Sequence, residues 1–114
     1  MRGGYLRLQD GLPTLEDRHR LAVLVDVEVG RCQIGDRIAI LSKNSIEYFL
    51  IYLAAARAGV VPIPLNYRLA PAEWSYILND SGARLILAAG DYAREIDAIR
   101  GELMSIERFI ASLP

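Results

Sequence analysis

Short apolar runs alternate with segments of helical periodicity over the last two thirds of the chain. Two short apolar runs, 37–41 and 84–88, predict buried strands, and Gly35 and Asp36 mark the start of the first. The run 60–65 contains two prolines, which cannot donate to a strand ladder, so it predicts a short strand near an edge of the sheet. A fourth strand is predicted over 108–111.

The segments between these strands predict helices near 45–58 and 71–80, and a further helix after residue 91. Asn44 and Glu47 have the spacing of a capping box, and Asp91 suits the cap of the last helix. Glycines follow the expected helix ends at Gly59, Gly82 and Gly101. Apolar residues at helical spacing mark one face of each helix: Ile46, Phe49, Leu50 and Leu53; Trp74, Ile77 and Leu78; Ile96 and Ile99.

This alternation predicts an α/β fold, in which a parallel sheet is connected by right-handed crossover helices. The segment before it is ambiguous. Valines at every second position up to Val29 favour a strand, whereas Thr14 and Asp17 are typical of a helix start. The sequence leaves both alternatives open for residues 21–29.

Composition narrows the classes of function. The net charge is −1 over 114 residues, which argues against general attraction to nucleic acid or an anionic membrane. A single cysteine, Cys32, and a single histidine, His19, exclude an internal disulfide, a cysteine-built zinc site and a multi-histidine metal site. No apolar run has the length of a membrane span, and residues 1–10 contain no apolar core of the kind that a signal peptide has. We therefore expect no metal site, no membrane span and a cytoplasmic location.

Three consecutive stretches carry a family resemblance: 35–48, 52–69 and 71–84. Together they resemble the adenylate-forming superfamily, and most closely its AMP-forming acyl-CoA and aryl-CoA synthetases. The middle stretch, with Ala-Gly-Val-Val-Pro-Ile-Pro-Leu-Asn-Tyr-Arg-Leu, is similar to a block typical of that family. The resemblance covers residues 34–111. It implies a partial α/β subdomain of the large N-terminal domain over residues 34–114, preceded by a divergent segment over residues 1–33.

The resemblance implies a two-step reaction that uses ATP, magnesium and coenzyme A. In the family, the phosphate-binding loop, a ribose-binding aspartate and a catalytic lysine all follow the region matched here. The sequence contains no such loop, so we expect no catalytic residue in this chain, no tight binding of these cofactors and no activity of the chain alone. Cys32 and His19 are interpreted as structural residues, and Lys43 as a solvated surface charge.

Arg68 is the one candidate site residue. It matches an arginine that approaches the nucleotide end of coenzyme A in some aryl-CoA ligases, and its fork of donors suits a phosphate. In the alternative interpretation, its stem packs on Tyr67 and it caps a loop.

Three hypotheses for function follow. The chain is the N-terminal portion of an acid–CoA ligase for a fatty or aromatic carboxylate, whose partner is the downstream part. Alternatively, it is a non-catalytic remnant or interaction module that associates with a chain carrying the rest. In the third hypothesis, it is a stand-alone flavodoxin-like binding domain, which requires a pocket at the carboxyl ends of the strands.

Overall fold

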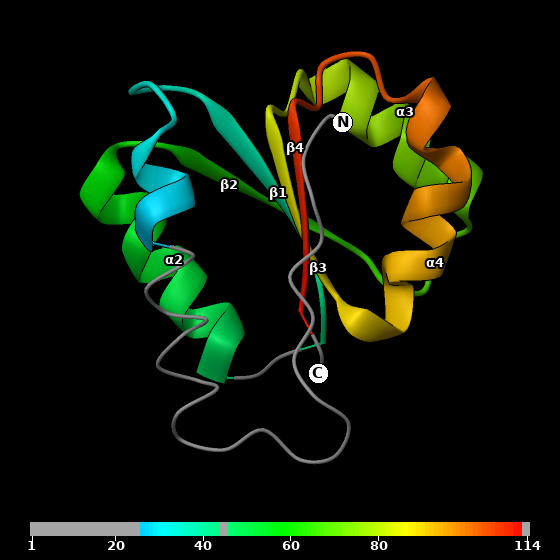
Figure 1. Ribbon diagram of the computed structural model, residues 1–114, viewed down its shortest axis with the longest axis horizontal. Helices are drawn as coiled ribbons and strands as arrows, with labels where there is room; N and C mark the ends of the chain where they lie inside the picture. Colours follow the sequence, from blue (N-terminus) through cyan, green and yellow to red (C-terminus); the bar gives the residue numbers. More distant parts are fainter. Residues whose placement is uncertain (1–25, 44–45, 113–114) are drawn as a thin grey trace.

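The fold is a four-stranded sheet flanked by helices, seen in a computed structural model that describes residues 26–43 and 46–112 (Figure 1). The elements follow one another as β1 (Arg37–Leu41), α2 (Ile46–Ala58), β2 (Val61–Leu65), α3 (Pro71–Ser81), β3 (Leu85–Ala89), α4 (Gly90–Ile99), the 3₁₀ helix η1 (Arg100–Glu102) and β4 (Arg108–Ser112).

The strands are all parallel and lie in the order β2-β1-β3-β4. The predicted α/β fold with a parallel sheet is therefore confirmed. The strand with two prolines, β2, occupies one edge of the described sheet, as its missing donors require. Two strands begin one residue later than predicted, at Val61 and Leu85.

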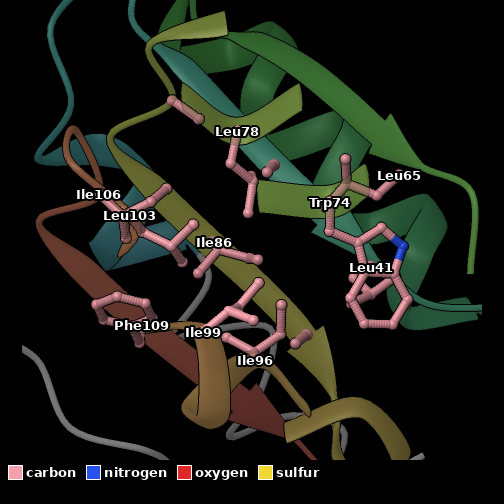
Figure 2. Close-up of a cluster of buried hydrophobic side chains, with 13 residues drawn as sticks. Leu41, Leu65, Trp74, Leu78, Ile86, Ile96, Ile99, Leu103, Ile106 and Phe109 are labelled. Carbon is pink, nitrogen blue, oxygen red and sulfur yellow. The ribbon is translucent and has the colours of Figure 1, made fainter. Parts of the chain in front are cut away.

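The sheet separates two hydrophobic clusters. Helix α2 covers one face of the sheet, and α3 and α4 cover the other (Figure 1). Side chains of β1 alternate between them, so that Ile38 and Ile40 pack with α2, and Leu41 packs with α3. In the cluster on the α3 and α4 face (Figure 2), Trp74 and Ile96 from the helices meet side chains of β1, β3 and β4.

Glycines end two helices as predicted. Gly59 and Gly82 have φ angles of 71° and 70°, the left-handed conformation that lets the chain leave a helix without a Cβ clash. The predicted cap at Asp91 is wrong. Helix α4 begins at Gly90, its N-cap is Ala89, and no side chain caps it. Asp91 lies instead in the first turn, where its negative charge suits the helix dipole. The Asn44 cap lies outside the described residues.

The face of α2 that meets the sheet differs from the predicted face. Phe49 and Leu53 are 62% and 48% exposed, whereas Ile51, Ala54 and Ala55 are buried. Small alanine side chains let the helix backbone approach the sheet closely, and this favours the alanine face over the bulkier one. Helix α2 is therefore apolar on two opposite sides.

Residues 26–30 are helical, so the strand alternative is wrong for the described part of the valine-rich segment. Val29 is fully buried against the α2 side of the sheet, while Val27 on the same helical turn is half exposed. Packing of one side overrides the weak strand preference of β-branched residues. Within the ranges described, no helix has both the length and the apolar character needed to cross a membrane.

Candidate functional site at the carboxyl edge of the sheet

The chain changes direction across the sheet between β1 and β3. From β1 the chain moves to the edge strand β2, and from β2 it crosses back past β1 to β3. Helix α2, which follows β1, covers one face and α4, which follows β3, covers the other, so the loops after β1 and β3 diverge to opposite sides. In open α/β sheets, ligands bind beyond the carboxyl ends of the strands at such a switch point. The loops after β1, β2 and β3 are therefore the natural place for a site.

Four side chains gather there, which we call the carboxyl-edge cluster: Lys43, Tyr67, Arg68 and Tyr92. The strand register explains how the first two meet. Leu41 pairs with Leu65, and two residues further along each strand direction are Lys43 and Tyr67. The Lys43 Nζ atom lies 5.5 Å from the centroid of the Tyr67 ring, and the Arg68 Cζ atom lies 5.4 Å from the same centroid. Both distances are within the range of a cation–π interaction.

The loop that carries Tyr67 and Arg68 is fixed by hydrogen bonds. The Arg68 backbone N–H donates to Asn66 Oδ1 at 3.0 Å, which forms an Asx turn. The Asn66 carbonyl accepts from the indole Nε1–H of buried Trp74 at 2.9 Å and from the Leu69 N–H at 3.1 Å. The loop is thus tied to the core through α3, and the cluster has a rigid base.

The aromatic rings connect the cluster to this core. The ring centroids of Tyr67 and Tyr92 are 6.1 Å apart, and Trp74 meets the Tyr92 ring edge-on, also at 6.1 Å. Burial raises the pKa of Tyr92, and the negative charge of Asp91 adds to this effect. The Tyr92 phenol therefore keeps its proton at neutral pH and remains a hydrogen-bond donor.

The candidate residue Arg68 is exposed, and its guanidinium lies over the Tyr67 ring, so it contacts the residue that the alternative interpretation names, although through the guanidinium and not the stem. Stacking leaves the guanidinium open to solvent, and the described residues offer it no carboxylate partner. The contact with coenzyme A stays a prediction. Lys43 was interpreted as a solvated charge. It is exposed, but it also belongs to the cluster, because the pairing of β1 with β2 places it beside Tyr67.

Cys32 lies near the start of β4, at the opposite edge of the sheet from the cluster. Its Sγ accepts a hydrogen bond from Arg108 Nη2 at 3.3 Å, and Arg108 also pairs with Glu28 at 3.0 Å. Burial raises the pKa of the Cys32 thiol, although Arg108 acts in the opposite direction. The thiol is therefore protonated at neutral pH, as suits a packing residue. His19 lies outside the described residues.

The donor set of the carboxyl-edge cluster suits anions. A guanidinium and an ammonium are both good partners for phosphate. Among the residues that the structure describes, no three acidic, histidine or cysteine side chains are grouped to hold a metal ion. The described part of the chain thus offers groups that bind a phosphorylated ligand, and we assign it no magnesium site.

The model of the AMP-binding enzyme family matches residues 16–111, which is most of the chain. The chain belongs to the AMP-binding enzyme family. This confirms the resemblance to AMP-forming acyl-CoA synthetases. The proposed boundary between residues 33 and 34 stays a prediction.

Several of the similar curated proteins are acid–CoA ligases. The chain is 44% identical over 68 residues to the long-chain-fatty-acid–CoA ligase FadD13 of Mycobacterium tuberculosis, a match that covers 60% of this chain and 14% of the ligase. It is 32% identical over 76 residues to the 4-hydroxybenzoate–CoA/benzoate–CoA ligase of Rhodopseudomonas palustris, which covers 67% of this chain and 14% of that enzyme. The chain thus spans about one seventh of the length of these curated relatives.

Solved structures show the same fold. A Mycobacterium tuberculosis fatty acyl CoA synthetase aligns with a TM-score of 0.71 at 31% identity, covering 94% of this chain and 22% of that one. The anthranilate CoA ligase AuaEII aligns with a TM-score of 0.72 at 22% identity, which supports the fold alone. The four-stranded sheet with its helices is therefore the fold of the matching part of these ligases.

Proposed function

We propose that this chain forms the N-terminal part of an acid–CoA ligase. The whole enzyme activates a fatty or aromatic carboxylate with ATP to an acyl-adenylate and then transfers the acyl group to coenzyme A. The observation that carries the proposal is family membership over residues 16–111, together with relatives named as fatty-acid–CoA and benzoate–CoA ligases. Because both substrate classes occur among these relatives, the proposal includes both.

We assign the chain a structural and binding role in that enzyme rather than a catalytic one. Adenylation requires donors and metal that stabilise negative charge on the α-phosphate and the pyrophosphate, and one such donor typically contributes about 3 to 4 kcal/mol. The sequence has no phosphate loop of the Ser/Thr/Gly-rich type that ends in Pro-Lys. Among the described residues, the cations of the carboxyl-edge cluster are held on one aromatic ring, which suits binding. The chain alone should therefore not adenylate a carboxylate.

Complementation tests this proposal. Pyrophosphate release is measured with ATP, magnesium and a panel of fatty and aromatic acids. The samples are the chain alone, the remaining part of the Mycobacterium tuberculosis ligase alone, and both together. We expect turnover only in the mixture. Turnover by the chain alone, abolished by a substitution within it, would overturn the proposal. A stable complex without turnover would favour the interaction-module alternative.

We also propose that Arg68 contacts a phosphate at the nucleotide end of coenzyme A in the assembled enzyme. Its support is an exposed guanidinium at the carboxyl edge without an ion pair among the described residues. In the complemented enzyme, Arg68→Gln should raise the KM for coenzyme A and leave ATP–pyrophosphate exchange unchanged. Arg84→Gln, which removes the same charge at the amino edge, is the matched control. An equal effect of both substitutions would contradict the assignment.

A further inference from the structure

We infer that Lys43 and Arg68 together form one binding site for a phosphorylated ligand that carries more than one negative charge, with Tyr67 as their common support. The nucleotide end of coenzyme A is the ligand of this class that the proposed function supplies. The inference extends the proposed role of Arg68 and rests on it for the identity of the ligand. The participation of Lys43 comes from the geometry of this chain.

The two cations converge from different strands. Lys43 follows β1, and Arg68 follows the neighbouring strand β2. Each lies within 5.5 Å of the same ring centroid, so Lys43 Nζ and Arg68 Cζ can be no farther apart than 10.9 Å, the sum of the two distances. A ligand with several phosphate oxygens can bind both groups across such a separation. A single charge would leave one of the two cations unmatched.

The charges around the cluster favour an anion from solution. Within the described part of the chain, no carboxylate lies within ion-pair distance of Lys43 or Arg68. The nearby acidic groups Asp91 and Glu95 raise the pKa of Tyr92. Two like charges held on one ring repel each other, and a bound anion relieves this repulsion. Most other described arginines of the chain have a carboxylate or carbonyl partner, as Arg84 and Arg37 do.

The site is also preorganised and correctly placed. The Asn66 turn and the Trp74 hydrogen bond fix the loop before any ligand binds, which lowers the entropic cost of binding. Lys43 and Tyr92 follow β1 and β3, the two strands between which the sheet switches direction. Cations that only cover an exposed aromatic ring could lie anywhere on the surface, whereas these two lie at the switch point of the sheet.

The only tryptophan of the chain provides a built-in probe. Trp74 contacts Tyr92 and holds the Tyr67 loop, so binding at the cluster should shift the NMR signal of its indole N–H. We would titrate the full chain with coenzyme A and, separately, with inorganic pyrophosphate. The proteins are wild type, Lys43→Gln, Arg68→Gln and the control Arg84→Gln. Backbone amide spectra of each variant verify that it is folded.

We expect binding in the millimolar range, about 4 kcal/mol. Lys43→Gln and Arg68→Gln should each weaken it by about threefold to tenfold, because each removes one charged contact. Arg84→Gln should bind as the wild type does. If the variants rank in the same order of affinity for pyrophosphate as for coenzyme A, this would support recognition through phosphate alone.

Several results would overturn the inference. If Lys43→Gln binds like Arg84→Gln while Arg68→Gln is weaker, the two-cation site is wrong and the proposed role of Arg68 stands. If all three variants weaken binding equally, net charge rather than a site determines it. Absence of any indole shift at millimolar ligand would also exclude the site, whatever the outcome of complementation.

Discussion

Trp74 is the residue on which the carboxyl-edge cluster depends most. Its six- and five-membered rings are buried between α3 and the sheet, while its one polar atom donates to the Asn66 carbonyl. A buried indole N–H without a partner would be costly, so this bond satisfies the core and positions the loop at once. The same side chain therefore links the stability of the core to the placement of Tyr67 and Arg68.

Cys32 gives a prediction of pH dependence. Burial raises the pKa of its thiol in the folded chain. As the pH rises through the ordinary thiol pKa, about 8.5, the unfolded chain loses this proton before the folded chain does. The free energy of unfolding should therefore fall above that pH through this group, and Cys32 should have no such effect at lower pH.

The measurement is urea unfolding of wild type and Cys32→Ala between pH 7 and pH 10. Above about pH 8.5, the unfolding free energy of the wild type should fall relative to that of Cys32→Ala. Other groups titrate in both proteins and cancel in the comparison. Parallel curves over the whole range would show that burial does not perturb this thiol.

At the scale of secondary structure, the order and type of the elements were predictable and the buried faces were not. The prolines of 60–65 indicated an edge strand, and Gly59 and Gly82 indicated helix ends, because each restricts the local backbone. The exposed face of α2 was missed because the helix is apolar on both sides, and periodicity cannot rank two apolar faces. The Asp91 cap failed because the helix begins one residue before it, at Gly90.

The candidate site was predictable in part for a similar reason. Arg68 can be proposed from the sequence because it lies in a recognisable stretch, and its contact with coenzyme A stays a prediction. The place of Lys43 in the cluster was missed, because its contact with Tyr67 depends on the pairing of β1 with β2. Paired residues of these two strands are 24 positions apart in the sequence. Contacts of this kind require the sheet order and the register, which local patterns do not contain.

The two helix-ending glycines test how much the left-handed backbone conformation contributes to stability. Gly59→Ala and Gly82→Ala should each lower the free energy of unfolding by about 1 to 2 kcal/mol, the usual cost of a left-handed non-glycine residue. A Cβ on Gly59 would lie 3.3 Å from the Ile34 Cγ1 atom, but Ile34 is exposed and can move aside. The two costs should therefore be similar.

Gly101→Ala is the control. This glycine lies in η1 without a positive φ angle, and nothing lies within 4 Å of an added Cβ. Its substitution should change the unfolding free energy by less than about 0.5 kcal/mol. Urea denaturation of the three variants decides the matter. A loss at Gly101 as large as at Gly82 would refute the backbone explanation.

The exposed side of α2 predicts self-association. Phe49 and Leu53 are one helical turn apart and place two large apolar side chains on the same exposed side. The double substitution Phe49→Glu and Leu53→Glu should shift the average mass in sedimentation experiments toward the 12.7 kDa monomer. Its effect on the unfolding free energy should be small because neither side chain is buried.

Tyr76→Glu serves as the comparison on α3, since Tyr76 is also an exposed aromatic residue. It should leave the self-association of the chain unchanged. If the Tyr76 variant dissociates the chain as well as the α2 variant does, general hydrophobicity explains the association, and α2 has no special role.

At the scale of the whole molecule, Arg108 joins parts of the chain that are far apart in sequence. It opens β4 and reaches the helical turn at residues 26–30 through Glu28, 80 residues earlier. The two side chains are only 20% and 14% exposed, so solvent screens the ion pair weakly. The pair ties the helical turn to the face of the sheet that α2 covers. We therefore expect it to stabilise that half of the molecule in particular.

Arg108→Met tests this arrangement, because methionine keeps part of the apolar stem and removes the charge. Glu28 would keep only its ion pair with the exposed Arg31, at 3.3 Å, so loss of its partly buried partner should cost about 1 to 3 kcal/mol. Arg84→Met removes the exposed Arg84–Glu107 pair, whose side chains are 50% and 62% exposed, and should cost less than about 1 kcal/mol. Denaturant unfolding measures both values.

Hydrogen exchange locates the effect. In Arg108→Met, the amides of residues 30–32 should exchange faster relative to those of α3, because the helical turn is released while α3 keeps its contacts. Glu28→Gln should give the same pattern, and the double variant should be less destabilised than the sum of the single variants, as is typical of directly coupled residues. Additive costs, or an equal increase of exchange in α3, would mean that Arg108 acts through the fold as a whole and does not hold the turn in place.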